Sequence, residues 1–326
     1  MSDGPWIFKK LGEIMRFSLS VFFVLLVAPL IGRAEGPAAN GAKAVLVTGA
    51  STGIGRKVTE RLAADGYFVY ATARKEDDLK ALGAIKNVHP LRLDVTEPAE
   101  IAAAVDAISK GGRGLYALVN NAGIATVGTI ADMSAEEFDL VMKVNAYGPV
   151  RMIKAFEPLL MAEKGRIINI GSISGILASP NLAAYSMSKH AIEALTDSLA
   201  AQLAESGVQV SVVEPGNYNS NIGKSALARI GADSKAVVST GYKLKADRSI
   251  YKEPDEVAVV VAQALSEPTV QRRYMVVPNQ DEAEVTIKKQ IEQLVQLNER
   301  QPYSYDRAAL VKMLDDALAQ VPPKGK

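Results

Sequence analysis

The sequence has 326 residues, no cysteine and two histidines, which excludes disulfides, thiol nucleophiles and cysteine-ligated or multi-histidine metal centres, so we predict no metal site. Its 37 Lys and Arg residues almost balance its 36 Asp and Glu residues, so a nucleic-acid partner is not expected. A hydrophobic share of 48% and a charged share of 22% are ordinary for a globular protein of one large or two small domains.

The first 34 residues differ from the rest of the chain. Basic residues precede an apolar run, Phe17–Ile31, which is 15 residues long. A membrane-spanning helix needs about 20 such residues, whereas the hydrophobic region of a secretory signal is shorter. Small residues at Gly32 and Ala34 fit the two positions that a signal peptidase reads. Residues 1–34 are therefore interpreted as a signal peptide cleaved after Ala34, which predicts an exported protein.

Two alternatives remain open for residues 1–34. An uncleaved segment would anchor the chain to a membrane, and only then do we expect membrane contact. A start assigned too early would instead leave a cytoplasmic protein. Met15 could itself open a shorter signal. The next residues, 35–43, are small and polar and predict a linker.

From residue 44 onward, short apolar runs alternate with stretches of helical periodicity. The runs are Ala44–Thr48, Tyr67–Ala71, Val88–Leu93, Ala117–Asn120, Arg166–Ile170, Val208–Val213 and Tyr274–Val277. The longer helical stretches between them include Ala99–Ser109, Ala135–Met161 and Ala183–Glu205. Near-continuous apolar strands that alternate with helices are typical of a parallel sheet covered on both faces. We predict an α/β fold, a single domain over 44–280 with a doubly wound parallel β-sheet of the Rossmann type.

Two segments fall outside this alternation. Asn217–Tyr251 is long, polar and rich in Gly and Ser, which predicts a functional loop. Residues 281–326 carry two amphipathic patterns and predict a helical C-terminal extension. Because Val285–Leu297 mixes acidic and basic residues on its polar side, we expect these helices to pack on the body or on another subunit rather than on a membrane.

A glycine-rich segment follows the first predicted strand. It reads Thr48-Gly49-Ala50-Ser51-Thr52-Gly53-Ile54-Gly55. Glycine lets backbone N–H groups approach a phosphate without an intervening side chain, and the N-terminus of the next helix adds a positive dipole end. The spacing G-x-x-x-G-x-G resembles that of the short-chain dehydrogenase/reductase family, which implies a nicotinamide dinucleotide held by Gly49, Ser51, Thr52, Gly53, Ile54 and Gly55.

The end of the second predicted strand selects the cofactor. An acidic residue there would bind the ribose 2′-hydroxyl of NAD, but none is present. Arg74 lies there instead, 19 residues after Gly55. A guanidinium can pair with a 2′-phosphate and gains little from a bare hydroxyl, so NADP(H) is predicted in preference to NAD(H). The alternative is that Arg74 and Lys75 form a solvated strand end.

Tyr185 and Lys189 open the helical stretch Ala183–Glu205 and lie four residues apart, on one face of it. A free phenol titrates near about 10, and a neighbouring cation favours the phenolate and lowers that pKa. The pair can therefore act as a general acid/base without a histidine. His190 is expected to be structural, and His89 to be a strand residue.

Further blocks match the same family, over about residues 44–280. Ser172 lies 13 residues before Tyr185, and Asn145 lies in the preceding helical stretch. With Tyr185 and Lys189 they match the family's catalytic tetrad. Ser174 is the rival for the serine role, but the interval favours Ser172.

The resemblance also implies further cofactor contacts. Asp94 and Val95 would contact the adenine, and the segment Asn120-Asn121-Ala122-Gly123 would brace the sheet beside the cofactor. Pro215 and Gly216 would flank the nicotinamide. Ser220 stands where the family often has Thr, and its hydroxyl could contact the carboxamide.

The implied reaction is hydride transfer between the nicotinamide and a carbonyl or alcohol carbon. Tyr185 would donate the proton, Ser172 would polarise the carbonyl, and Lys189 would hold the nicotinamide ribose and lower the Tyr185 pKa. Asn145 would support a water that resupplies the proton. The helical segment Tyr185–Leu199 and the segment Thr72-Ala73-Arg74 resemble the hydroxysteroid and retinol dehydrogenase branch of the family, which implies a hydrophobic ketone or alcohol, steroid- or retinoid-like.

Alternative functions are a catalytically silent NADP(H)-binding sensor or scaffold and a sugar-nucleotide epimerase. The intact tetrad argues against the first, and the glycine spacing argues against the second. Family members commonly form homodimers or homotetramers through the helices that hold Asn145 and Tyr185, so we expect the same here. An exported NADP(H) enzyme would also be unusual, because the cofactor pool is cytoplasmic.

Overall fold

The computed structural model describes residues 41–231, 233–240 and 247–321. The predicted signal or anchor, residues 1–34, and most of the predicted linker, 35–43, lie outside these ranges. Within them, no helix is long and apolar enough to span a membrane.

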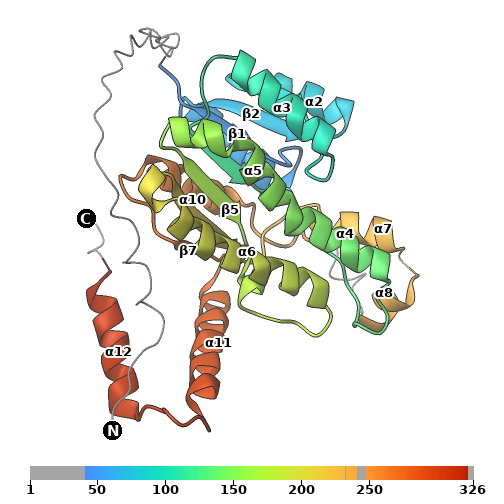
Figure 1. Ribbon diagram of the computed structural model, residues 1–326. Coiled ribbons are helices and arrows are strands. Elements are labelled where there is room, and N and C mark those ends of the chain that lie inside the picture. The colour runs from blue at the N-terminus through green and yellow to red at the C-terminus, as the bar shows by residue number, and fades with distance from the viewer. Residues whose placement is uncertain (1–40, 232, 241–246, 322–326) are drawn as a thin grey trace, which may run out of the picture. The chain divides into compact units, whose positions relative to one another are not determined.

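Seven parallel strands form one sheet in the order β3-β2-β1-β4-β5-β6-β7 (Figure 1). Their bounds are β1 Ala44–Val47, β2 Phe68–Ala73, β3 Val88–Arg92, β4 Ala117–Asn120, β5 Arg166–Ile170, β6 Gln209–Pro215 and β7 Arg273–Val276. The winding direction reverses between β1 and β4, which places a crevice beyond the carboxyl ends of these strands. The predicted doubly wound α/β fold is therefore confirmed.

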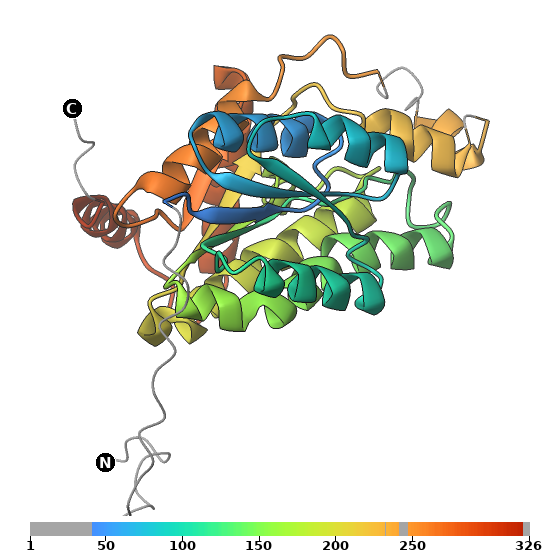
Figure 2. The same cartoon turned by 90° about the horizontal axis from the view of Figure 1, so that it is seen from above.

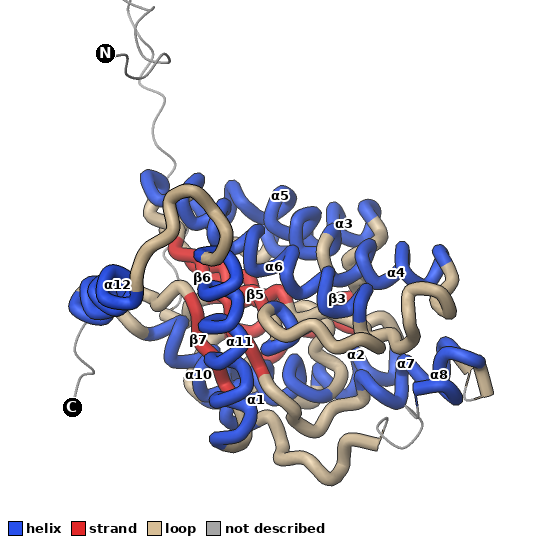
Figure 3. Tube along the Cα trace, turned by 90° about the horizontal axis from the view of Figure 1, so that it is seen from below, coloured by secondary structure: helices blue, strands red, loops and turns tan. Residues whose placement is uncertain are grey.

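Helices cover both faces of this sheet (Figures 2 and 3). Their bounds are α1 Gly53–Ala64, α2 Glu76–Gly83, α3 Pro98–Lys110, α4 Ala135–Asn145, α5 Tyr147–Ala162, α6 Ala183–Gln202, α7 Ile222–Ile230, α8 Lys235–Thr240, α10 Asp255–Ser266, α11 Gln280–Asn298 and α12 Arg307–Ala319. Two short 3₁₀ helices are η1 Ile173–Gly175 and η2 Ala204–Ser206.

The core lies in two layers because successive strand residues point to opposite faces. Val45 and Val47 of β1 pack on the face covered by α1, α2 and α10, where Leu62 is buried. Leu46 of the same strand packs on the face covered by α3, α5 and α6, where Phe156 is buried. Burial on both faces explains why the strands read as near-continuous apolar runs.

Two predicted elements differ from the structure. The predicted helix Ala135–Met161 is two helices, α4 and α5, which meet at Ala146. The predicted loop Asn217–Tyr251 contains α7 and α8, whose few buried side chains, such as Ala226 and Val237, are too scattered among Gly and Ser to reveal helical periodicity. Residues 241–246 of that segment lie outside the described ranges.

The C-terminal extension is helical as predicted (Figure 1). Its apolar stripe on α11, however, is not covered by the described part of the chain. On α11, Ile287 is 51% exposed and Ile291 is 54% exposed, whereas Thr286 is fully buried. Packing of the stripe on the body is therefore not found, and packing on another subunit stays a prediction.

Candidate active site

The loops that follow β1, β2 and β4 meet at the carboxyl edge of the sheet. Gly49 N–H donates to the Thr72 hydroxyl at 3.2 Å, which ties the end of β1 to β2. The Thr48 hydroxyl accepts from the backbone N–H of Asn121 at 2.9 Å and of Ala122 at 3.0 Å, which ties β1 to the end of β4. The predicted glycine segment is thus fixed from both sides.

The glycines of this segment leave no room for side chains. Gly49 has φ +65°, and a Cβ there would lie 2.9 Å from the Ala122 Cα. A Cβ on Gly55 would overlap the Asn121 side-chain amide and the Gly49 carbonyl oxygen. The Asn121 amide uses this space to donate to the carbonyls of Thr48 and Gly49, at 2.9 and 3.0 Å. The segment is therefore a tight backbone cradle.

The N-terminus of α1 opens onto this cradle and suits an anion. Thr52 is its N-cap but accepts no side-chain hydrogen bond from the helix, and the first turn carries no acidic residue. The N-termini of α4 and α12, in contrast, are capped by the side chains of Ser134 and Asp306. Uncapped N–H groups at the positive end of a helix dipole bind phosphate, so the residues present fit a dinucleotide.

Arg74 and Asp94 lie side by side beyond β2 and β3. Arg74 Nη1 donates to Asp94 Oδ2 at 3.3 Å, and the Arg74 side chain is 66% exposed. Burial opposes ionisation of Asp94, but hydrogen bonds from Thr96 and Arg74 hold the pKa of this carboxyl below its ordinary value. Val95 is buried against Gly148 at the start of α5. The structure thus presents a guanidinium to the solvent at the sheet edge where the 2′-phosphate is predicted.

Asn145 occupies the break between α4 and α5. Its side chain brackets one residue of the loop after β4, because Nδ2 donates to the Ile124 carbonyl at 2.8 Å and Oδ1 accepts from Ile124 N–H at 2.9 Å. Nδ2 also contacts the Ser188 hydroxyl at 3.0 Å, and that hydroxyl donates to the Tyr185 carbonyl at 2.7 Å. These bonds connect Asn145 to the helix that carries Tyr185.

Lys189 is buried between α6 and the end of β5. Its Nζ donates to the Ile170 carbonyl at 2.8 Å and lies 5.7 Å from the centre of the Tyr185 ring. Burial lowers the pKa of Lys189 to about 8, and the nearby Glu193 carboxylate partly opposes this shift. The ammonium and the phenol ring are therefore neighbours, as their four-residue spacing predicts.

Ser172 lies two residues after Ile170, the last residue of β5, and is 9% exposed. Its hydroxyl accepts from the backbone N–H of Ser174 at 3.0 Å and caps η1. Ser172 therefore lies next to the carbonyl that holds Lys189. Ser174, the other candidate for the serine role, contacts the Ser172 hydroxyl through its backbone N–H.

Two acidic side chains near Lys189 are not predicted from the sequence: Glu193, which is mostly buried, and its neighbour Glu214, which is buried. Glu193 follows Lys189 by one turn of α6, and its Oε1 fills space left by the absence of a side chain at Gly175. Glu214, near the end of β6, is 2% exposed. Arg273 Nε lies 3.1 Å from the Glu193 carboxylate and 3.7 Å from that of Glu214. Among the described residues, no group of three potential metal ligands is found.

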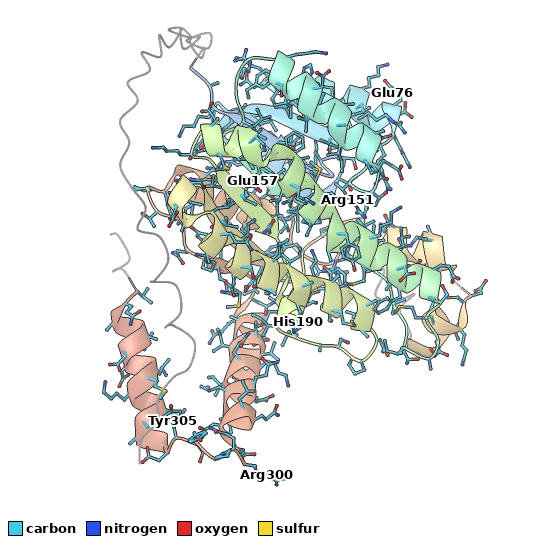
Figure 4. All side chains as sticks on the ribbon, viewed as in Figure 1. Glu76, Arg151, Glu157, His190, Arg300 and Tyr305 are labelled. Carbon is cyan, nitrogen blue, oxygen red and sulfur yellow. The ribbon has the colours of Figure 1, made fainter. Side chains whose placement is uncertain are left out.

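The histidines lie apart from this chemistry. His190 Nδ1 lies 2.8 Å from the Ser186 carbonyl, within α6, and its ring is exposed (Figure 4). His89 lies in β3, where it is exposed beside Phe68 and Tyr70. The prediction that His89 is a strand residue is confirmed, and the structural role of His190 stays a prediction.

The segment that follows β6 lies between the sheet and the glycine cradle. Gly216 N–H donates to the Val276 carbonyl at 2.8 Å and continues the pairing of β6 with β7. Ser220 reaches the glycine cradle, since a Cβ on Gly53 would lie 3.1 Å from the Ser220 Cβ. The predicted residues Pro215, Gly216 and Ser220 thus belong to one segment between the sheet and the cradle.

Comparison with known proteins agrees with this arrangement. Residues 43–230, more than half of the chain, match the short chain dehydrogenase family. D-beta-hydroxybutyrate dehydrogenase, mitochondrial, from Mus musculus is 37% identical over 211 residues, which are 62% of this chain and 61% of that protein. The chain therefore spans less than two thirds of that relative.

Two solved structures share the fold. Actinorhodin polyketide ketoreductase with NADPH is 30% identical and has a TM-score of 0.63, with 73% of this chain and 96% of that chain covered. A short chain dehydrogenase/reductase from Burkholderia phymatum in complex with NAD has a TM-score of 0.69, with 81% and 98% covered. At 24% identity the second likeness shows the fold alone.

Proposed function

The chain belongs to the short-chain dehydrogenase/reductase family, and on this premise we propose that it is an NADP(H)-dependent oxidoreductase that interconverts a carbonyl and an alcohol. The observation that carries the proposal is the convergence of Asn145, Ser172, Tyr185 and Lys189 beside a glycine cradle with an uncapped helix N-terminus.

Each of these side chains has a role that its position supports. NADP(H), when bound, supplies or accepts the hydride. Tyr185 gives its phenol proton to the developing alkoxide, and Ser172 donates a hydrogen bond to the same oxygen. Lys189 places its buried ammonium beside the phenol and stabilises the phenolate that remains. Asn145 holds the loop at Ile124 and orients α6 through Ser188.

The cofactor is held by the backbone and by few side chains. Residues 49–55 cradle its phosphates at the start of α1, and Asn121, Ala122 and Gly123 support that cradle. Asp94 and Val95 would flank the adenine, while Arg74 would pair with the 2′-phosphate and so favour NADP(H) over NAD(H). This preference is supported by the exposed guanidinium and by the absence of an acid at the end of β2.

The proposed substrate is a hydrophobic ketone or its alcohol, of steroid or retinoid type. A second candidate, a silent NADP(H)-binding sensor or scaffold, would keep the cradle and need none of the tetrad. Oxidation of NADPH in the presence of a panel of ketones separates the two, since only the enzyme consumes cofactor.

Replacing Tyr185 with Phe tests the catalytic proposal. Because Phe keeps the ring beside Lys189 and removes the proton, we expect kcat to fall by about 10²–10⁴-fold, while NADPH still binds. Steady-state rates and NADPH fluorescence titration measure the two effects. The matched control is Tyr303→Phe, since Tyr303 is 81% exposed after α11. Turnover of the Tyr185→Phe variant at the wild-type rate would refute the role.

A further inference from the structure

The segment between β6 and α7 is held by the C-terminal extension as well as by the sheet. Asn217 is its central contact. The Asn217 backbone N–H donates to Glu282 Oε2 at 2.8 Å, and its side-chain Nδ2 donates to Glu282 Oε1 at 3.1 Å. Both oxygens of one carboxylate therefore bind one residue, in a pair of charge-assisted hydrogen bonds.

Glu282 is itself held in a fixed position in the first turn of α11. Its backbone N–H donates to Oδ1 of the N-cap residue Asn279 at 2.9 Å. Its carbonyl accepts from the hydroxyl of Thr286, which is fully buried, at 2.7 Å. The carboxylate thus projects from a helix start whose geometry is set by a cap and a buried side chain.

The absence of a side chain at Gly216 leaves the space that the Glu282 carboxylate occupies. A Cβ on Gly216 would overlap Glu282 Oε2 and would lie 3.0 Å from a Val277 methyl group. A side chain at position 216 would therefore displace the Glu282 carboxylate from its present position.

Arg248 holds the same residue from the opposite side. Its Nη2 donates to Asn217 Oδ1 at 3.0 Å, and its Nε donates to the Tyr218 carbonyl at 2.9 Å. The Asn217 side chain thus bridges a carboxylate and a guanidinium. Tyr218, 2% exposed, donates its hydroxyl to Glu256 at 2.6 Å.

The held segment ends against the cradle, where Ser220 approaches Gly53. Residues 215–220 therefore extend from the start of α11 to the cradle. We propose that Glu282 is a positioning residue for the cofactor site, which fixes the segment 215–220 against the glycine cradle through Asn217. This inference rests on the proposed function, which assigns that segment to the nicotinamide side.

Replacing Glu282 with Ala removes both hydrogen bonds to Asn217. We expect the Kd for NADPH to rise about tenfold, the equivalent of one charge-assisted hydrogen bond, with a rise in KM for NADPH that exceeds the fall in kcat. Hydrogen exchange of residues 215–220 in the cofactor-free protein should become faster, since the Asn217 N–H loses its acceptor. Glu282→Gln keeps one acceptor oxygen and should give a smaller effect of the same sign.

The matched control is Glu284→Ala. Glu284 lies in the same turn, is exposed and pairs with Lys288 within the helix, so its loss should leave Kd and exchange unchanged. The inference is overturned if Glu282→Ala behaves as Glu284→Ala does in both measurements. Should Glu282→Ala fail to fold, wild-type values for Glu282→Gln overturn it. A wild-type protein that binds neither NADPH nor NADH overturns the proposed function and, with it, this role.

Discussion

Glu193, near the proposed catalytic Lys189, forms an acid pair with the buried Glu214. Each has a buried carboxyl oxygen, Oε1, without a hydrogen-bond donor. One proton shared between the two carboxyl groups satisfies both oxygens, which a pair of carboxylates cannot do. Burial and the neighbouring carboxylate raise the pKa of Glu214 to about 8, and burial also raises that of Glu193. We therefore expect the pair to hold a proton at neutral pH in the folded protein.

This proton makes stability depend on pH. A carboxyl whose pKa is raised from its ordinary 4.5 to about 8 binds more protons when folded, so it stabilises fully below about pH 4.5 and loses that contribution as the pH rises to about 8. Glu214→Gln, which is neutral throughout, should flatten this decline. Each pKa unit is about 1.4 kcal/mol, or a Tm difference of about 3–6 °C in a domain of this size.

Melting temperatures measured from about pH 5 to about pH 8.5 check this expectation. Glu205→Gln is the control, because Glu205 is exposed in η2. Equal slopes for wild type and Glu214→Gln would contradict the shared proton.

Arg74 gives a second prediction at the level of one side chain. Arg74→Asp removes the guanidinium and adds an acid that can accept from a ribose 2′-hydroxyl. The loss of a hydrogen bond between charged groups is worth about 1.5–3 kcal/mol, so kcat/KM for NADPH relative to NADH should fall by about tenfold to a hundredfold. Lys86→Asp, an exposed charge reversal, serves as control. An unchanged ratio would show that Arg74 is only a solvated strand end.

The element that most constrains the site is the turn between β1 and α1. Gly55→Ala would force a Cβ into the Asn121 amide and the Gly49 carbonyl, both part of the bracing network. We expect a loss of about 1–3 kcal/mol of stability and weak binding of the dinucleotide. Urea unfolding and NADPH titration measure both.

Gly83→Ala in α2 is the matched control for this substitution. There the Cβ meets only the Pro90 ring, at 3.3 Å. A Gly55→Ala protein as stable and as tightly binding as this control would contradict the steric argument.

The elements differ in how far the sequence reveals them. Strand β1 is a continuous apolar run, and the buried strand β5 is apolar except for Arg166 and Asn169, so their positions and the parallel sheet follow from local pattern. The break at Ala146 also has a local signal, which the predicted helix Ala135–Met161 does not take into account: Pro149, in the first turn of α5, has no N–H to donate to the Asn145 carbonyl and so disfavours a continuous helix there. The bonds of Asn145 to Ile124 and Ser188 form only after folding.

The contacts of the site likewise differ in how far the sequence predicts them. Tyr185 and Lys189 are four residues apart, and helix geometry alone makes them neighbours. Glu282 and Asn217 are 65 residues apart and belong to no local pattern. Their contact depends on how the C-terminal extension leaves β7, which no spacing in the sequence encodes.

At the scale of the whole molecule, apolar surface remains on two sets of helices. One face of α5, by its 3.6-residue period, carries Tyr147, Val150 and Met161, which are 57%, 36% and 43% exposed. Met187 on α6 is 50% exposed. The stripe on α11 is the second surface. Exposed apolar side chains gathered on helix faces are typical of subunit interfaces.

We expect the protein to be a homodimer or homotetramer that uses the face of α5. A C2 interface buries the same patch on both subunits, so each added charge is buried twice. Val150→Glu with Met161→Glu should therefore reduce a homodimer to monomers, or a homotetramer to dimers. Ile291→Glu with Leu294→Glu on α11 is the matched comparison and should leave the α5-mediated dimer intact. Light scattering after size-exclusion chromatography gives the masses. A monomeric wild-type protein would exclude the predicted association. An α5 variant that keeps the mass of the wild-type oligomer would show that the interface lies elsewhere.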